Sequence, residues 1–379
     1  MENFQFYNPV RIIFGRGQIK SLSKNIPQKS KVLLTYGGGS IKKNGVYEQT
    51  IKHLSDCEIF EFGGIEPNPQ FSTLMKAVHL GREKKVDYIL AVGGGSVLDG
   101  SKFIAAAIPF QGDEWKLVSE NLTTEKTIPL GAILTLPATG SEMNCFSVIS
   151  RKETNEKLGF ANPKCFPKFS ILDPETTFSL PPEQVANGIV DAFVHVMEQY
   201  LTFLTNSPLQ DRMAEAVVKT LVEEGPKSLK NLSDYESRAN YMWSATMALN
   251  GLIGVGVPQD WATHGIGHQI TVRTGLAHAR TLAIILPAIW EENFENKKEK
   301  LAHMAERIWG KRDPKLAIEK TKEFFHSLGV STELRSSGMK KEELISLIVG
   351  DLVYQETLPL GERSDIDKAK LTKILERAW

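Results

Sequence analysis

The sequence Asp87-Tyr-Ile-Leu-Ala-Val92 runs directly into Gly93-Gly-Gly-Ser-Val-Leu-Asp-Gly-Ser-Lys102. The short apolar run predicts a buried strand, and the glycines after it predict a tight turn into a helix. Glycines let the backbone approach a pyrophosphate closely, and a helix start directs free N–H groups at it. The stretch therefore predicts a phosphate-binding strand–turn–helix unit, although glycine clusters also occur in ordinary tight turns.

Two further apolar stretches repeat this pattern. Lys31-Val-Leu-Leu-Thr-Tyr36 runs into Gly37-Gly-Gly-Ser40, and Leu130-Gly-Ala-Ile-Leu-Thr-Leu136 runs into Pro137-Ala-Thr-Gly-Ser-Glu-Met-Asn144. Amphipathic segments such as Phe71-Ser-Thr-Leu-Met-Lys-Ala-Val-His-Leu80 lie between the apolar stretches. Strands that alternate with helices predict a parallel sheet, whose ligands bind outside the carboxyl ends of the strands. We expect all three polar loops at that end.

The sequences of the glycine loops also indicate which nucleotide the protein binds. None reads Gly-x-Gly-x-x-Gly or ends in Gly-Lys-Ser/Thr, which argues against an ordinary Rossmann fingerprint or a Walker NTPase. An NAD site usually places a carboxylate near the adenosine ribose, but the stretch 36–43 has none and ends in Lys42 and Lys43. Backbone amides, Ser40 and a nearby cation suit a 2′-phosphate. We therefore expect NADPH rather than NADH, although both lysines also fit solvated helix charges.

The composition changes near Leu172-Asp-Pro-Glu-Thr-Thr-Phe-Ser-Leu-Pro-Pro182, where prolines and hydroxyls predict a linker. We expect an α/β dinucleotide-binding domain over residues 1–181 and an all-α metal-binding domain over residues 182–379. Amphipathic periodicity predicts helices at about 183–204, 209–231, 235–252, 260–272, 296–309, 314–328, 340–355 and 366–378.

The helical half contains candidate metal ligands. Asp191 and His195 are four residues apart in an apolar segment of helical period, so both side chains leave one helix face. His264 and His278 follow in two short glycine-containing stretches. One carboxylate and three imidazoles suit a single Zn²⁺ or Fe²⁺. An isolated Asp or His is more commonly a surface or core residue, and spacing alone also allows His264 and His268 as a ligand pair.

The composition of the chain indicates which partners and which compartment to expect. The 379 residues carry a formal net charge of zero, which gives no attraction to nucleic acid or an anionic membrane. No apolar run is long enough to span a bilayer, and the N-terminus lacks the pattern of a signal peptide. Cys57, Cys145 and Cys165 have neither metal nor redox spacing. These features predict a cytoplasmic protein whose partners are small molecules.

The chain resembles the group III, iron-containing alcohol dehydrogenase family, especially its NADPH-dependent butanol dehydrogenase and broad aldehyde reductase branch. The likeness covers essentially the whole chain. It implies a dehydroquinate-synthase-like fold, with the active site in the cleft between an α/β domain and a helical domain, and a homodimer. The stretches that carry it are Tyr36–Ser40, Gly93–Lys102, Pro137–Asn144, the Asp191/His195 helix, Asp260–His268 and Gly275–Arg280.

The resemblance also implies roles for particular residues. His268 would lie beside the metal without ligating it and would relay a proton or position substrate, although it also fits a packing residue. Lys157 would reach the cofactor, although it also fits a surface lysine. The implied metal ligands are Asp191, His195, His264 and His278. The implied cofactor contacts are Gly37, Gly38, Gly39, Ser40, Gly94, Gly95, Ser96, Asp99, Thr135, Thr139, Lys157 and Leu180.

The reaction that this resemblance implies is the reversible reduction of small aldehydes, such as butanal, to primary alcohols. NADPH would supply the hydride, and Fe²⁺ or Zn²⁺ would act as a Lewis acid on the carbonyl. Three alternatives remain: a glycerol-type polyol dehydrogenase with NAD, a metal-independent maleylacetate reductase, and a non-enzymatic nucleotide or metal sensor. The complete ligand set argues against the last two.

Overall fold

The computed structural model describes residues 1–379, which divide into two compact units. The sheet unit comprises residues 7–180 and 232–246, and the helical unit comprises residues 1–6, 181–231 and 247–379. The chain therefore crosses between the units more than once. The domain boundary at 181/182 stays a prediction, because compactness does not test whether either part folds independently.

The sheet unit is built on a six-stranded sheet in the order β1-β8-β5-β4-β2-β3, with every neighbouring pair parallel. Strands β6 and β7 form a separate antiparallel pair. Strand β4, which includes the first two glycines after Val92, lies between β5 and β2. The strands are β1 Arg11–Phe14, β2 Lys31–Tyr36, β3 Glu58–Phe62, β4 Tyr88–Gly94, β5 Leu130–Leu136, β6 Phe146–Arg151, β7 Glu156–Ala161 and β8 Phe169–Leu172.

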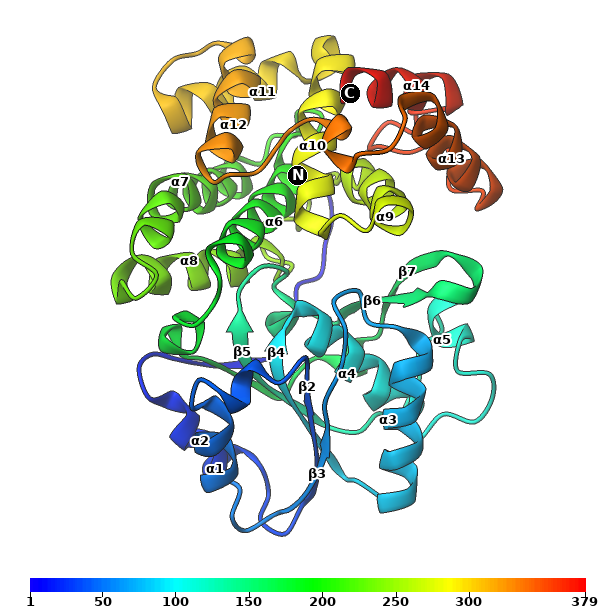
Figure 1. Ribbon diagram of the computed structural model, residues 1–379. Helices are drawn as coiled ribbons and strands as arrows, with labels where there is room; N and C mark the ends of the chain where they lie inside the picture. Colours follow the sequence, from blue (N-terminus) through cyan, green and yellow to red (C-terminus); the bar gives the residue numbers. More distant parts are fainter. The chain divides into compact units, whose positions relative to one another are not determined.

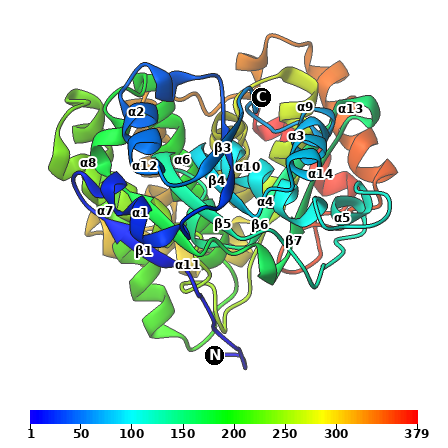
Figure 2. The same ribbon diagram turned by 90° about the horizontal axis from the view of Figure 1, so that it is seen from below.

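Helices cover both faces of this sheet. Helices α1 (Leu22–Asn25) and α2 (Val46–Lys52) lie on one side of β4, and α3 (Phe71–Lys84) and α4 (Gly95–Ala107) lie on the other, as Figures 1 and 2 both show. The short helix α5 (Lys116–Ser119) packs near β7. This arrangement of layers confirms the predicted α/β fold with a parallel sheet.

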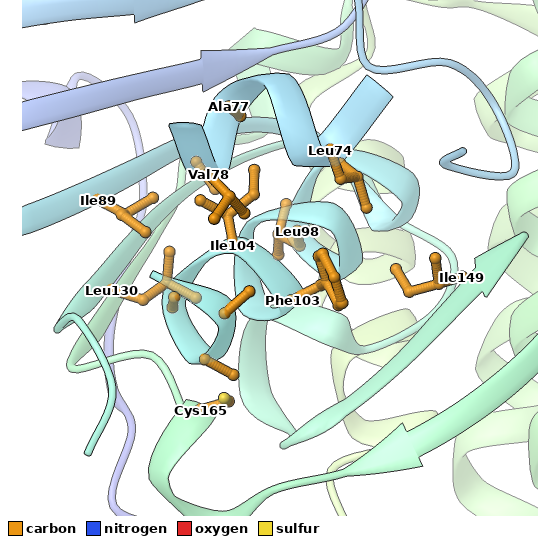
Figure 3. Close-up of a cluster of buried hydrophobic side chains, with 14 of the residues drawn as sticks. Leu74, Ala77, Val78, Ile89, Leu98, Phe103, Ile104, Leu130, Ile149 and Cys165 are labelled. Carbon is orange, nitrogen blue, oxygen red and sulfur yellow. The ribbon is translucent and has the colours of Figure 1, made fainter. Parts of the chain in front are cut away.

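Alternate residues of each central strand enter different cores. Ile89 packs in a cluster with side chains of α3 and α4, including Val78 and Ile104 (Figure 3). The next residue, Leu90, packs instead with Leu22 of α1 on the opposite face. Because successive side chains of a strand point to opposite faces, a sheet covered on both sides needs a continuous apolar run. That requirement explains the sequence of β4.

The helical unit is formed around α6, whose side chains are buried from Val185 to Tyr200. Helix α6 packs against α7 and α10, and α10 packs against α9. Helix α8 spans the change of unit near residue 246. None of the helices is both long and apolar enough to cross a membrane. The helices are α6 Pro182–Tyr200, α7 Pro208–Lys230, α8 Tyr235–Ala248, α9 Ala262–Thr274, α10 His278–Glu292, α11 Phe294–Trp309, α12 Pro314–Ser327, α13 Lys341–Tyr354 and α14 Lys368–Arg377.

Helix α10 (His278–Glu292) is absent from the predicted helices. Its residues Leu282 to Trp290 are all buried, and Pro287 lies inside the helix. A helix that is apolar all round gives no amphipathic period, and an internal proline normally argues against a helix. Packing against α6, α9 and α14 therefore determines this element more than local pattern does. The short 3-10 helices are Gln18–Ser21, Ser40–Lys42, Ser141–Met143, Lys152–Thr154, Pro163–Cys165, Pro174–Thr177 and Leu334–Ser337.

Candidate metal centre and cofactor loops

Helix α6 positions the first two candidate ligands. Asp191 and His195 lie one turn apart on this buried helix and are only 4% and 5% exposed. Their apolar neighbours, such as Val190 and Val194, are fully buried and fix the rotation of the helix. The Asp191 Oδ1 atom lies 3.8 Å from His195 Nδ1, beyond hydrogen-bond distance. The helix thus holds a carboxylate and an imidazole close together without pairing them.

Two other helices bring further imidazoles to the same place. His264 lies in the first turn of α9, and its ring centroid is 4.5 Å from that of His195. Asp191, His195 and His264 each offer a ligand atom within 4.8 Å of the others. His278 begins α10, and its Nε2 atom is 4.0 Å from Asp191 Oδ1. The structure therefore brings all four predicted ligands together, with the first three forming the tighter group.

These side chains fit a divalent metal ion. Asp191 Oδ1 and His195 Nδ1 are buried and have no hydrogen-bond partner, a state that costs free energy unless another group satisfies them. Metal–ligand bonds of about 2.0–2.2 Å place neighbouring ligand atoms roughly 3–4 Å apart, close to the separations seen here. Burial lowers the pKa of His195 to about 4, so this imidazole is neutral near pH 7, as ligation requires.

Glu198 completes the site and was missed by the sequence reasoning. Its Oε2 atom hydrogen-bonds to His264 Nδ1, and its Oε1 atom accepts hydrogen bonds from the Thr263 and His264 backbone N–H groups at 2.7 and 3.2 Å. The contact at Nδ1 fixes the orientation of the His264 ring. Burial raises the pKa of Glu198. Its position seven residues after Asp191, on the same helix face, was the available signal.

Asp260 supports this arrangement from the start of α9. Its N–H donates to the Glu198 carbonyl oxygen at 2.7 Å, and its Oδ1 atom accepts from the Ala262 N–H at 3.0 Å. Its other oxygen is 3.0 Å from the buried ammonium of Lys297, which is also 2.9 Å from Glu362. Asp260 therefore anchors the beginning of the helix that carries His264, as an N-terminal residue of a helix commonly does.

His268 lies one turn after His264 on α9. Its ring centroid is 5.0 Å from that of His278 and 6.2 Å from that of His264. It is not part of the group formed by Asp191, His195 and His264. Its predicted part in proton transfer or substrate positioning stays a prediction.

The three glycine-containing segments lie at the carboxyl ends of β2, β4 and β5, which are adjacent in the sheet, and β4 passes directly into α4 at Gly95. The junction of β4 and α4 is closely packed, since a Cβ atom on Gly95 would lie 2.6 Å from Thr139 Oγ1 of the β5 loop. The β2 loop is open at Gly38, where a Cβ atom would meet no atom within 4 Å, but not at Gly37, where it would lie 3.3 Å from the Ile65 carbonyl oxygen. Gly39 has a φ of +87°, which favours glycine. The open backbone at Gly38 fits a bound phosphate-bearing cofactor.

The remaining predicted cofactor contacts differ in their surroundings. Asp99 already accepts hydrogen bonds from Ser141 Oγ at 2.6 Å and from the Val148 N–H at 2.9 Å, so its carboxylate ties the β5 loop to β6. Lys157 is only 6% exposed and is therefore not a surface lysine. Gly37, Gly94, Ser40, Ser96, Thr135 and Leu180 lie at or near the loops after β2, β4, β5 and β8. Their contacts with a cofactor stay predictions.

A carboxylate lies beside the β2 loop, contrary to the expectation from the sequence of the loop itself. The β2 loop contains no carboxylate, but the structure places Glu61 of the neighbouring strand β3 beside it, with Oε2 2.8 Å from Lys42 Nζ and 3.0 Å from the Tyr36 hydroxyl. Glu61 follows Gly37 by 24 residues in the sequence, and the parallel pairing of β3 with β2 brings it back beside the loop.

The chain is similar to known proteins over its whole length. The model of the iron-containing alcohol dehydrogenase family matches residues 9–174, and the model of the family's C-terminal part matches residues 185–379. NADPH-dependent aldehyde reductase YqhD from Escherichia coli is 50% identical, with 100% of both chains covered. A crystal structure of the E. coli K-12 protein YqhD has a TM-score of 0.97 at 49% identity and covers 100% of this chain and 99% of that chain. The structure of NADH-dependent butanol dehydrogenase A from Thermotoga maritima has a TM-score of 0.94 at 36% identity, with 100% and 99% covered.

Proposed function

This chain belongs to the iron-containing alcohol dehydrogenase family, and from that membership we propose that it reduces small, butanal-like aldehydes to primary alcohols with NADPH, reversibly. It is an oxidoreductase acting on the CH–OH group. The aldehyde reductase of E. coli, at 50% identity over the full length, supports the proposed substrate class and cofactor. The observation that carries the proposal is the buried group of Asp191, His195 and His264.

We propose that Asp191, His195, His264 and His278 hold one divalent metal ion, either Fe²⁺ or Zn²⁺. Both ions accept nitrogen and oxygen ligands of this kind. The unsatisfied buried atoms of Asp191 and His195 support this assignment. When bound, the metal would supply Lewis acidity to the aldehyde oxygen, and NADPH would supply the hydride.

The chain's own residues would prepare the reaction in three ways. Glu198 holds the His264 ring through Nδ1 and thereby presents Nε2 to the metal position. Burial of His195 and Asp191 keeps bulk water away from these two ligands, which strengthens electrostatic effects on a developing negative charge. His268 would deliver the proton that converts the reduced oxygen into a hydroxyl.

In the sheet unit, we propose that the glycine loops hold the nucleotide. Gly94, Gly95 and Ser96 would bind the pyrophosphate where α4 begins, since the first N–H groups of a 13-residue helix lack partners within that helix. Gly37, Gly38, Gly39 and Ser40 would bind the adenosine end. Asp99, Thr135, Thr139, Lys157 and Leu180 would complete the cofactor site as supporting contacts.

The proposal is tested by steady-state kinetics with butanal and NADPH, followed by identification of butanol as the product. Oxidation of one NADPH for each butanol formed supports it. Turnover with glycerol and NAD but none with butanal would indicate a polyol dehydrogenase on the same scaffold. Tight NADPH binding with no turnover of aldehydes or alcohols would indicate a sensor.

We also propose a cytoplasmic homodimer whose residues 1–181 and 182–379 form two domains. Three free cysteines support a reducing compartment. The edge strand β1 of the sheet unit, with Phe14 39% exposed, supports a contact between copies. Sedimentation equilibrium measures the number of chains, and a monomer at micromolar concentration would contradict the dimer.

A further inference from the structure

The segment after β3 lies along the β2 loop. The Gly64 N–H donates to the Gly37 carbonyl oxygen at 2.9 Å, and the Ile65 N–H donates to the Tyr36 carbonyl oxygen at 3.2 Å. A Cβ atom on Gly63 would lie 2.4 Å from the Tyr36 ring, so only glycine permits this approach. Side chains near the end of β3 are therefore held beside the loop proposed to bind the adenosine end of the cofactor.

A group of four side chains, the Glu61 cluster, occupies this place and comprises Tyr36, Lys42, Tyr47 and Glu61. Lys42 Nζ is 2.8 Å from Glu61 Oε2, and the Tyr36 and Tyr47 hydroxyls donate to the same carboxylate at 3.0 and 2.5 Å. The ammonium also lies 5.1 and 4.6 Å from the two ring centroids. The lysine and the carboxylate are thus held in one geometry by two aromatic side chains.

Lys42 and Glu61 of this cluster are ionised near neutral pH and open to solvent. The hydrogen bond from Lys42 lowers the pKa of Glu61, and the hydrogen bond to Glu61 raises the pKa of Lys42. The Lys42 side chain is 43% exposed and that of Glu61 is 34% exposed, so both can reach a ligand. None of the four residues is needed to explain the proposed reaction at the aldehyde.

We propose that the pairing of Glu61 with Lys42 sets the choice between NADPH and NADH. Lys42 binds the 2′-phosphate of NADPH, and Glu61 accepts a hydrogen bond from the free 2′-hydroxyl of NADH. Because the two charges neutralise each other, a 2′-phosphate must compete with Glu61 for the ammonium and is repelled by the carboxylate. The pair therefore moderates the NADPH preference and leaves some affinity for NADH. This inference rests on the proposed function.

The test measures the dissociation constants of NADPH and NADH by quenching of intrinsic protein fluorescence. We expect Glu61→Gln to bind NADPH roughly three- to fivefold more tightly and NADH more weakly, as loss of a solvent-exposed charge pair permits. Lys42→Gln should bind NADPH roughly fivefold or more weakly and should change NADH binding little. Glu58→Gln is the matched control, because it removes the same charge from the same strand, where Glu58 lies 3.9 Å from Lys31. This control should change neither constant.

Unchanged constants in both Glu61→Gln and Lys42→Gln, with normal NADPH binding by the wild-type protein, would overturn this inference and leave the proposed function intact. Wild-type protein that binds neither nucleotide would overturn both. Equal weakening of both nucleotides in Glu61→Gln would also contradict a role in selection, since it would indicate general disturbance of the loop.

Discussion

The histidine site and the glycine loops are built in opposite ways. The histidine site depends on side chains whose positions are fixed by three buried helices, α6, α9 and α10. The glycine loops depend on the absence of side chains, since Gly95 closely approaches Thr139 and Gly38 leaves its backbone open. Substitutions in the histidine site should therefore abolish metal binding and activity. A side chain added at a glycine of the loops should instead block binding of the nucleotide.

The largest effect is expected from removal of the only carboxylate among the proposed ligands. Asp191→Ala should lose the metal and lower kcat/KM by about a thousandfold or more, because Lewis-acid assistance contributes several kcal/mol to the transition state. Metal content by mass spectrometry and steady-state kinetics check this. NADPH affinity should be nearly unchanged, since the glycine loops are untouched. Stoichiometric metal in Asp191→Ala would show that this residue is not a ligand.

A smaller loss is expected when the proposed proton donor is removed. His268→Gln should keep its metal but lower kcat by about a hundredfold, as removal of a positioned acid commonly does. The measurement pairs metal analysis with the dependence of kcat on pH. If His268→Gln instead purifies without metal, the residue is a ligand and its assignment to proton transfer is wrong.

A Glu198 variant tests whether a residue that holds a proposed ligand, without being a ligand itself, contributes to metal affinity. Glu198→Gln should weaken metal affinity about 10- to 100-fold, because the His264 ring loses the carboxyl group that holds its Nδ1 atom. Competition with a chelator measures this affinity directly. Glu215→Gln is a suitable control, since it removes a carboxylate on α7 that bonds to Tyr200 at 2.9 Å, away from the histidines. Equal metal affinities in the two variants would rule out the positioning role.

The smallest change in function is expected from a substitution in the β2 loop. It tests whether this loop binds the nucleotide or is an ordinary turn. An alanine methyl group at Gly38 meets no protein atom within 4 Å, so Gly38→Ala should fold with nearly unchanged stability. It should nevertheless bind NADPH about tenfold more weakly, because the methyl group crowds the approaching phosphate. Thermal unfolding and nucleotide titration check both parts. Unchanged NADPH affinity would favour the turn interpretation.

The sequence predicted those features that have a local cause. The apolar run of β4 and its glycines indicated a buried parallel strand that turns into a helix, and the structure confirms the fold, with β4 passing directly into α4 at Gly95. The spacing of Asp191 and His195 placed both on one face of a helix. These predictions succeeded because strand alternation and helical period are properties of neighbouring residues.

The features that the sequence did not predict arise from packing between distant segments. Helix α10 has no amphipathic period, since its side chains from Leu282 to Trp290 are buried. The spacing of Glu198 from Asp191 places it on the ligand face of α6, but its contact with His264, which comes 66 residues later, arises only from tertiary packing. Glu61 reaches the β2 loop only through the pairing of β3 with β2. In each case the functional contact depends on tertiary structure, which local patterns do not encode.

The most direct test of the central claim measures NADPH oxidation with butanal before metal removal, after verified removal by a chelator, and after reloading with Fe²⁺ or Zn²⁺. Activity that disappears with the metal and returns on reloading is the predicted result, and the ion that restores more activity identifies the better metal. Undiminished activity in protein shown to be free of metal would contradict the role assigned to Asp191, His195, His264 and His278.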